Sequence, residues 1–200
     1  MKRFILASGS PQRIQLLQAA RYNFIAQTAS ITELAVDFLT PGELTLLNAC
    51  RKAFAVARTE PNAVVLGADT LVALGTKMFG KPADLDEAGR MLAQLSGRTH
   101  EVLTGIAITN FSERRTISAV VGSEVRFREL NADLIDRYLS RIDPLRKAGA
   151  YAAQIDPETV IERIDGSFTN VVGLPMETVS QLLAEFGIQP GGEEPVIGNQ

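Results

Sequence analysis

The stretch AVVLGADTLVAL, residues 63–74, is an apolar run interrupted near its centre by Asp69 and Thr70. Runs of this kind are typical of a buried strand. A carboxylate in such a run is costly to bury unless it meets a cation, a network of hydrogen-bond donors or a metal ion. We therefore expect Asp69 to hold a divalent ion and to orient or deprotonate a water molecule. A strand-end aspartate that only caps a turn is the structural alternative.

The segments around this strand predict a mixed sheet of the α/β class, an α+β arrangement rather than a plain doubly wound one. Residues 100–109 and 116–127 flank a polar tip and indicate a long antiparallel hairpin, whereas the other units are of parallel type. Further strands are expected at residues 3–7, 22–27 and 159–164, helices at 11–20, 41–58, 84–97, 131–142 and 175–186, and loops at 78–82 and 166–173, the last of which also fits a strand.

The chain has 200 residues, of which 46% are hydrophobic and 22% charged, so it is able to bury a core of ordinary size. No linker precedes residue 188, which predicts a single domain over residues 1–187. Pro, Gly, Glu and Asn dominate the last segment, so residues 188–200 are expected to form a disordered tail.

The charge pattern excludes several classes of partner. A net charge of -3 gives no basic surface for a nucleic acid polymer or an anionic membrane. The chain also lacks an apolar run long enough to span a bilayer or to form a signal-peptide core. With one cysteine and one histidine, a zinc site is not expected, and His100 reads as a structural group at a strand edge. A cytoplasmic protein that binds a small anion fits these features.

The turn after the first strand has the residue types of a phosphate site. Ser8, Gly9 and Ser10 are small enough to let the backbone approach an oxyanion, and Pro11 suits the first position of a helix. Arg13 adds a fork of donors. A capped helix with a solvated arginine is the structural alternative, and sugar nucleotidyltransferases open with a similar loop.

Several charged residues elsewhere would complete a site for a triphosphate. Lys52, Lys81 and Lys147 lie in loop or helix contexts, and Glu33 lies in a short polar stretch. Each alone is more typical of a solvated charge. A triphosphate, however, requires several cations and a metal ion to converge on it.

Seven short motifs follow one another along the chain: LASGSP (6–11), GADT (67–70), GKP (80–82), LSGRTH (95–100), TG (104–105), KAGAY (147–151) and NVVGLP (170–175). In these motifs and their order, the chain resembles the Maf family of nucleotide pyrophosphatases, also called septum-formation inhibitors, from about residue 3 to residue 186. The resemblance implies an elongated, two-lobed molecule with a deep central cleft, related to inosine-triphosphate pyrophosphatases. It also implies metal-dependent release of pyrophosphate from a nucleoside triphosphate.

The resemblance also implies roles for particular residues. Asp69 matches the proton acceptor, and Glu33, Lys52 and Lys81 match the other charged residues of the active site. Mg²⁺ or Mn²⁺ would be held by Asp69 and Glu33. The substrate would be dTTP or UTP, and a homodimer is expected from the common case. Substrate-binding positions are expected at Ser8, Ser10, Gln12, Arg13, Thr70, Lys147 and Gln154, of which Gln12, Thr70 and Gln154 belong to the set that governs base preference.

Two residues depart from the family's pattern. Gln12 stands where the family usually has an arginine, and Arg146 stands where this branch usually has an aspartate.

Two other functions compete with the enzyme. A nucleotide-binding regulator of cell division would hydrolyse its ligand only incidentally and would not need a water-activating acid. A nucleotidyltransferase would need a sugar-phosphate co-substrate and a turn richer in glycine.

Overall fold

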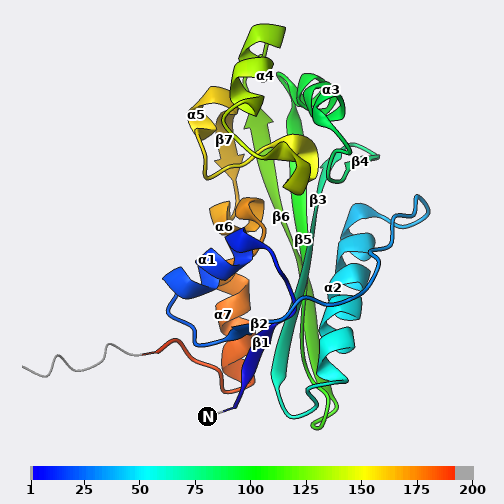
Figure 1. Ribbon diagram of the computed structural model, residues 1–200, viewed down its shortest axis with the longest axis vertical. Helices are drawn as coiled ribbons and strands as arrows, with labels where there is room; N and C mark the ends of the chain where they lie inside the picture. Colours follow the sequence, from blue (N-terminus) through cyan, green and yellow to red (C-terminus); the bar gives the residue numbers. More distant parts are fainter. Residues whose placement is uncertain (1, 192–200) are drawn as a thin grey trace, which may run out of the picture.

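The computed structural model describes residues 2–191 and shows an elongated molecule built along one mixed sheet (Figure 1). Six of the seven strands follow the order β2-β1-β3-β5-β6-β7, and the seventh, β4, pairs with the far end of β3. The strands β1, β2 and β3 are parallel, and all other pairs are antiparallel. The strands are β1 (Phe4–Leu6), β2 (Ile25–Ala26), β3 (Val64–Leu74), β4 (Lys77–Phe79), β5 (Thr99–Asn110), β6 (Arg115–Phe127) and β7 (Ile161–Asp165).

The helices cover both faces of this sheet. Those with eight or more residues lie close to the predicted ranges, and Asp84 caps its helix as its position suggests, accepting from the Glu87 amide. The helices are α1 (Pro11–Ala19), α2 (Pro41–Ala57), α3 (Leu85–Leu95), α4 (Ala132–Leu139), α5 (Pro157–Val160), α6 (Phe168–Val172) and α7 (Met176–Glu185), with the short 3₁₀ turns η1 (Pro144–Arg146) and η2 (Ala148–Ala150).

The sheet therefore has the expected mixed α/β character, but three local predictions are wrong. Residues 77–79 form the strand β4 inside the predicted loop, because they pair with the end of β3. Residues 168–172 form the helix α6 rather than a loop or strand, with Ser167 accepting from the Asn170 amide. The strand expected over residues 22–27 shrinks to two residues, Ile25 and Ala26.

The predicted tail boundary after residue 187 is also too early. Ile188 is buried in the same core as Leu183 and Phe186, and its amide donates to the Leu183 carbonyl. The Gly191 amide then donates to the carbonyl of Arg21. An apolar residue directly after a helix can still pack on that helix, whatever the composition of the chain beyond. The remainder of the predicted tail, residues 192–200, lies outside the described residues.

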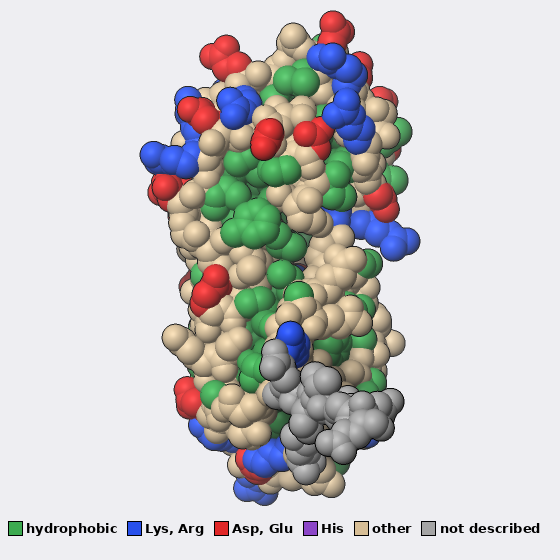
Figure 2. Space-filling model, turned by 90° about the vertical axis from the view of Figure 1, so that its left-hand side faces the viewer, with side chains coloured by type: hydrophobic (Ala, Val, Ile, Leu, Met, Phe, Trp, Pro, Cys, Tyr) green, Lys and Arg blue, Asp and Glu red, His purple; other side chains and the backbone are tan. Residues whose placement is uncertain are grey.

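Three long strands join two lobes. In the lower lobe, α1 and α7 pack on one face of the sheet and α2 covers the other. The upper lobe packs α3 and α4 against the far ends of β3, β5 and β6 (Figure 1). Figure 2 shows charged side chains of both signs crowding the upper end of one face, while hydrophobic side chains occupy its middle.

Alternation along β3 places neighbouring residues on opposite faces of the sheet. Val65 packs with α2, whereas Val64, Leu66 and Ala68 pack in the core under α1 and α7. Side chains of a strand alternate with a period of two. Asp69 therefore faces α2, and Thr70 faces the opposite side.

The helix α2 approaches the sheet unusually closely, at two glycines. A Cβ atom added to Gly67 would stand 2.2 Å from the carbonyl oxygen of Ala49, and one added to Gly105 would stand 2.4 Å from the amide nitrogen of Leu46. Both contacts are with helix backbone, which is fixed by its own hydrogen bonds. Only glycine at these positions allows α2 to lie this close to β3 and β5.

His100 lies in the core of the upper lobe, on the interior strand β5, not at a strand edge. Its Nε2 lies 3.0 Å from the Tyr151 hydroxyl, and its ring stands edge-on to the rings of Tyr151 and Phe127. Its Nδ1 has no hydrogen-bond partner among the described residues. Burial lowers the pKa of His100 to about 4, so the ring is neutral near pH 7.

We predict that Gly67→Ala lowers the free energy of unfolding by about 3 kcal/mol, because the added methyl group must push α2 away from the sheet. Gly122→Ala in β6 is the matched control, since nothing lies within 4 Å of a Cβ added there. Urea denaturation monitored by circular dichroism measures both variants. Equal stability of the two variants would contradict the proposed packing constraint.

A second prediction concerns pH. The unfolded chain takes up a proton at His100 near the ordinary pKa of about 6.5, whereas the folded protein resists protonation until about pH 4. The pKa difference should therefore remove up to about 3 kcal/mol of stability as the pH falls from 6.5 toward 4, with the contribution fully present above 6.5. Because the chain has one histidine, NMR titration gives a single set of imidazole signals. A midpoint near 6.5 would show that the ring is not shielded.

Candidate active site

A cavity of about 1350 Å³ opens between the two lobes, where the edge of β3 is bare. The pairing of β3 with β1 ends at Leu66, and its pairing with β4 begins at Val72. Between these residues, β3 is paired with β5 on one side only, and its other edge lies against the cavity. The carbonyl of Ala68 accepts from Lys52 on one side and from Arg13 on the other. The expected deep cleft is thus built around a gap in the sheet.

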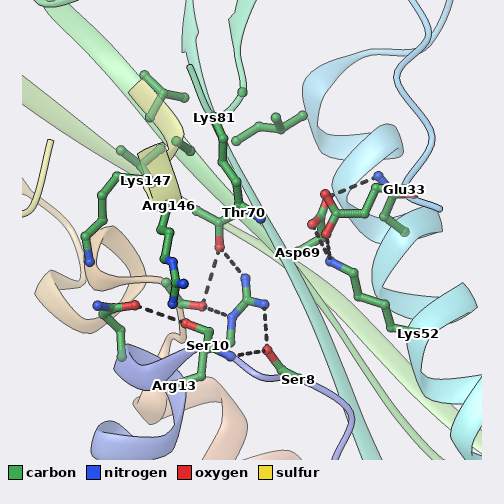
Figure 3. A pocket seen from close by; sticks show the side chains of 18 of the residues that line it. Ser8, Ser10, Arg13, Glu33, Lys52, Asp69, Thr70, Lys81, Arg146 and Lys147 are labelled. Carbon is green, nitrogen blue, oxygen red and sulfur yellow. Dashed lines mark hydrogen bonds and ion pairs between the residues drawn. The ribbon is translucent and has the colours of Figure 1, made fainter. Parts of the chain in front are cut away.

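On the α2 face of this gap, Lys52 links the two predicted acids. Its Nζ lies 2.7 Å from Asp69 Oδ1 and 2.6 Å from Glu33 Oε1 (Figure 3). The side chains of Lys52 and Asp69 are about nine-tenths buried, whereas that of Glu33 is 46% exposed. The structure therefore brings together three of the four charged residues that the resemblance assigns to the active site.

Asn48 is a site residue that the sequence interpretation missed. It is buried, and its Nδ2 donates to Asp69 Oδ2 over 3.1 Å. The same amide exchanges hydrogen bonds with the backbone of Leu34, which fixes the loop that carries Glu33. A signal was present, because Asn48 precedes Lys52 by four residues and so shares its face of α2. Both oxygens of Asp69 are thus held in place by α2.

The cations of the cavity keep Glu33 ionised. Burial alone would raise the pKa of Glu33, but the hydrogen bond and charge of Lys52 and the charges of Lys81 and Arg13 bring it below its usual value. Lys81 is exposed, lines the same cavity and points into it from the loop after β4 (Figure 3). The site therefore presents two carboxylates and two lysines together.

Arg13 does not extend into the cavity as the free fork that its sequence position suggests. Its Nε donates to the Gly173 carbonyl over 2.8 Å and its Nη1 to the Ala68 carbonyl over 2.9 Å. Its Nη2 donates to the Thr70 hydroxyl over 3.0 Å, and the side chain is buried. Arg13 instead joins α1 to β3 and to the turn after α6. Thr70 is engaged in the same network, because its hydroxyl also pairs with that of Thr104.

The predicted phosphate turn lies at the lower wall of the cavity. Ser8 accepts from the Ser10 amide, and the Ser10 hydroxyl donates to Gln12 rather than capping the helix. The first amides of a helix have no partner inside that helix. All three side chains line the cavity, as does Gly9.

The upper wall contributes the remaining predicted residues. Lys147 is half-buried and Gln154 is exposed, and both line the cavity. Burial lowers the pKa of Lys147, against the opposing charge of Asp143. Arg146, which was noted only as a departure, lines the cavity as well. The structure thus gathers every predicted site residue around one cavity, but from two lobes and both faces of the sheet.

The carboxylates of Asp69 and Glu33 are the oxygen ligands that the site could offer to a hard divalent cation. In the structure, the point that both carboxylates face is taken by the Lys52 ammonium nitrogen, which lies within 2.7 Å of each. Among residues 2–191, no cluster of three or more His, Cys, Asp or Glu side chains could hold a metal unaided. Mg²⁺ is commonly bound by one or two carboxylates together with substrate phosphates. A metal ion here would therefore use the other lone pairs of these carboxylates and take its remaining ligands from a phosphate.

Comparison with known structures supports the fold. A solved HAM1 protein from Coxiella burnetii superposes with a TM-score of 0.52, covering 92% of this chain and 100% of that protein. Sequence identity is 17%, so this likeness concerns the fold alone.

Within residues 2–191, no helix has the length and apolar character that crossing a bilayer requires.

Sequence comparison identifies the family. The dTTP/UTP pyrophosphatase of Bacillus cytotoxicus is 40% identical over 93% of this chain and 96% of that protein. Those of Symbiobacterium thermophilum and Bacillus pumilus are each 42% identical, covering 94% and 95% of this chain and 95% and 100% of their own lengths. The family model described as Maf-like protein matches residues 3–186. This chain therefore belongs to the Maf family.

Proposed function

We propose that this protein hydrolyses dTTP and UTP to the nucleoside monophosphate and pyrophosphate. The observation that carries the proposal is Asp69, a carboxylate held on both oxygens by Lys52 and Asn48 at the bare edge of β3. A carboxylate fixed in this way beside a large cavity is suited to orient a water molecule and accept its proton. The names of the similar proteins supply the substrate class.

The residues on the α2 face divide the chemistry between them. Lys81 would stabilise the negative charge that develops on the pyrophosphate leaving group, whereas Lys52 holds Asp69 and Glu33 in place through its two ion pairs. Glu33, kept ionised by its cationic neighbours, and Asp69 would hold Mg²⁺ or Mn²⁺, which supplies further stabilisation of that charge. Asn48 holds the second oxygen of Asp69 so that the carboxylate keeps one orientation.

Base preference would be decided at Gln154, whose amide can pair with the carbonyl and N3–H groups of uracil or thymine. Thr70 can contribute less to base preference than its sequence position suggests, because its hydroxyl already forms hydrogen bonds with Arg13 and Thr104. A cytoplasmic location and a homodimer are part of the same proposal, as the ordinary state of a small metabolic enzyme.

A regulator of cell division that binds nucleotides without turnover is the rival function. Binding alone does not require a buried carboxylate with two fixed partners, so the geometry of Asp69 favours the enzyme. Nucleotidyl transfer is not favoured by any feature of the cavity.

The test is a panel of nucleoside triphosphates assayed for released pyrophosphate. We expect dTTP and UTP to give the highest kcat/KM, ahead of CTP, ATP and GTP, because the amide of Gln154 can pair with the carbonyl and N3–H groups of uracil or thymine. Preference for a purine would overturn the substrate assignment while leaving the reaction type. Release of phosphate instead of pyrophosphate would overturn both.

Asp69→Asn is expected to lower kcat by at least about two orders of magnitude, the usual scale for a general acid–base group. Asparagine is nearly isosteric and Lys52 keeps its ion pair with Glu33, so the fold should survive. Asp37→Asn is a matched control, because Asp37 also lines the cavity but makes no contact with Lys52 among the described residues. Turnover of Asp69→Asn close to that of the control would remove Asp69 from the mechanism.

Metal removal gives a separate prediction. Excess EDTA should abolish pyrophosphate release, and Mg²⁺ or Mn²⁺ should restore it, because the available ligands are oxygens. Glu33→Gln should raise the Mg²⁺ concentration needed for half-maximal rate, whereas Asp37→Asn should leave it unchanged. Full activity in EDTA is the result that would contradict a metal role for Glu33 and Asp69.

A further inference from the structure

The lower wall of the cavity lacks the free cation that its sequence predicts. The guanidinium of Arg13 donates hydrogen bonds to Gly173, Ala68 and Thr70, so few of its N–H groups are left for a ligand. Lys52 is likewise committed to Asp69 and Glu33. A negatively charged ligand at this wall needs positive charge from another element.

The cavity as a whole carries more positive than negative charge, although the chain is acidic overall. Its cations are Arg13, Lys52, Lys81, Arg146 and Lys147, and its acids are Glu33, Asp37 and Asp69. Two of these acids are bridged by Lys52. Arg13 is buried and donates to neutral groups, so the accessible cations of the cavity are Lys81 and the adjacent pair in the upper wall, Arg146 and Lys147.

The side chain of Arg146 extends from the upper wall into the cavity. Figure 3 shows its side chain running from the upper wall toward the side where Ser10 lies. The residue is 76% exposed, and its ion pair with Asp143, three residues earlier, spans 3.6 Å from Nε. So long and exposed an ion pair contributes little to stability, and the guanidinium therefore remains available to a ligand.

We propose that Arg146 is a substrate-binding residue, whose guanidinium donates hydrogen bonds to a phosphate oxygen of the bound nucleotide from the upper wall. A planar guanidinium matches the oxygens of a phosphate in a two-point contact, which an ammonium group does not provide. The contact joins the upper lobe to a ligand whose other groups meet the lower lobe. This proposal rests on the proposed function for the identity of the ligand.

The experiment measures binding without turnover. Isothermal titration calorimetry with α,β-methylene-UTP, whose α–β bridge is not hydrolysed, is performed on the wild-type protein, Arg146→Gln and Arg146→Lys. Arg163→Gln on β7 is the matched control, because Arg163 is 71% exposed and also pairs with a nearby acid, Asp165. Inorganic triphosphate serves as a competitor that lacks a nucleoside.

We expect Arg146→Gln to weaken binding of both the analogue and inorganic triphosphate by about tenfold, and Arg146→Lys to weaken it less. Arg163→Gln should bind as the wild type does. Unchanged affinity in Arg146→Gln would overturn the proposal, and so would a loss confined to the analogue, which would place the contact on the nucleoside.

Turnover of UTP by the wild-type protein separates this proposal from the proposed function. Loss of affinity in Arg146→Gln without any wild-type pyrophosphate release would support the contact and reject the enzyme. Normal wild-type turnover with unchanged affinity in Arg146→Gln would support the enzyme and reject the contact.

Discussion

The close contact between α2 and the central strands is the constraint on which the rest of the structure depends. Gly67 and Gly105 leave no side chain between the helix and the sheet, so the backbone of α2 rests directly on β3 and β5. In the same stretch of α2, Asn48 and Lys52 reach Asp69. With larger residues at the two glycines, the helix would stand off and these contacts would not form.

The cavity arises where strand pairing is interrupted. Because β1 ends before β4 begins, a short length of β3 has no neighbour on one side, and side chains from both faces bond to the exposed carbonyl of Ala68. The alternation of β3 sends Asp69 to one face and Thr70 to the other. Consecutive residues of one motif therefore have different partners: Asp69 contacts Lys52 and Asn48, and Thr70 supports Arg13.

Much of the fold follows from local sequence patterns, and less of the site does. The apolar run with Asp69 at its centre, the long hairpin and the capped helices all express periodicities that span many residues. The strand β4 and the helix α6 are too short to show a period, and only their pairing and capping reveal them. The engagement of Arg13 was not predictable, because its partners Gly173 and Ala68 are backbone carbonyls far from it in sequence. The placing of Lys52 and Asp69 in one site was predicted only through family resemblance, and their direct ion pair was not predicted.

The two lobes share β3, β5 and β6, each of which runs without a break from one lobe to the other. A cleft between domains joined by loops can open by rotation about a few backbone torsions. Here the same movement must twist or bend three hydrogen-bonded strands at once, so the sheet resists opening of the cavity more than a loop hinge would. Such an architecture allows small movements of one lobe relative to the other, which reverse when the ligand leaves.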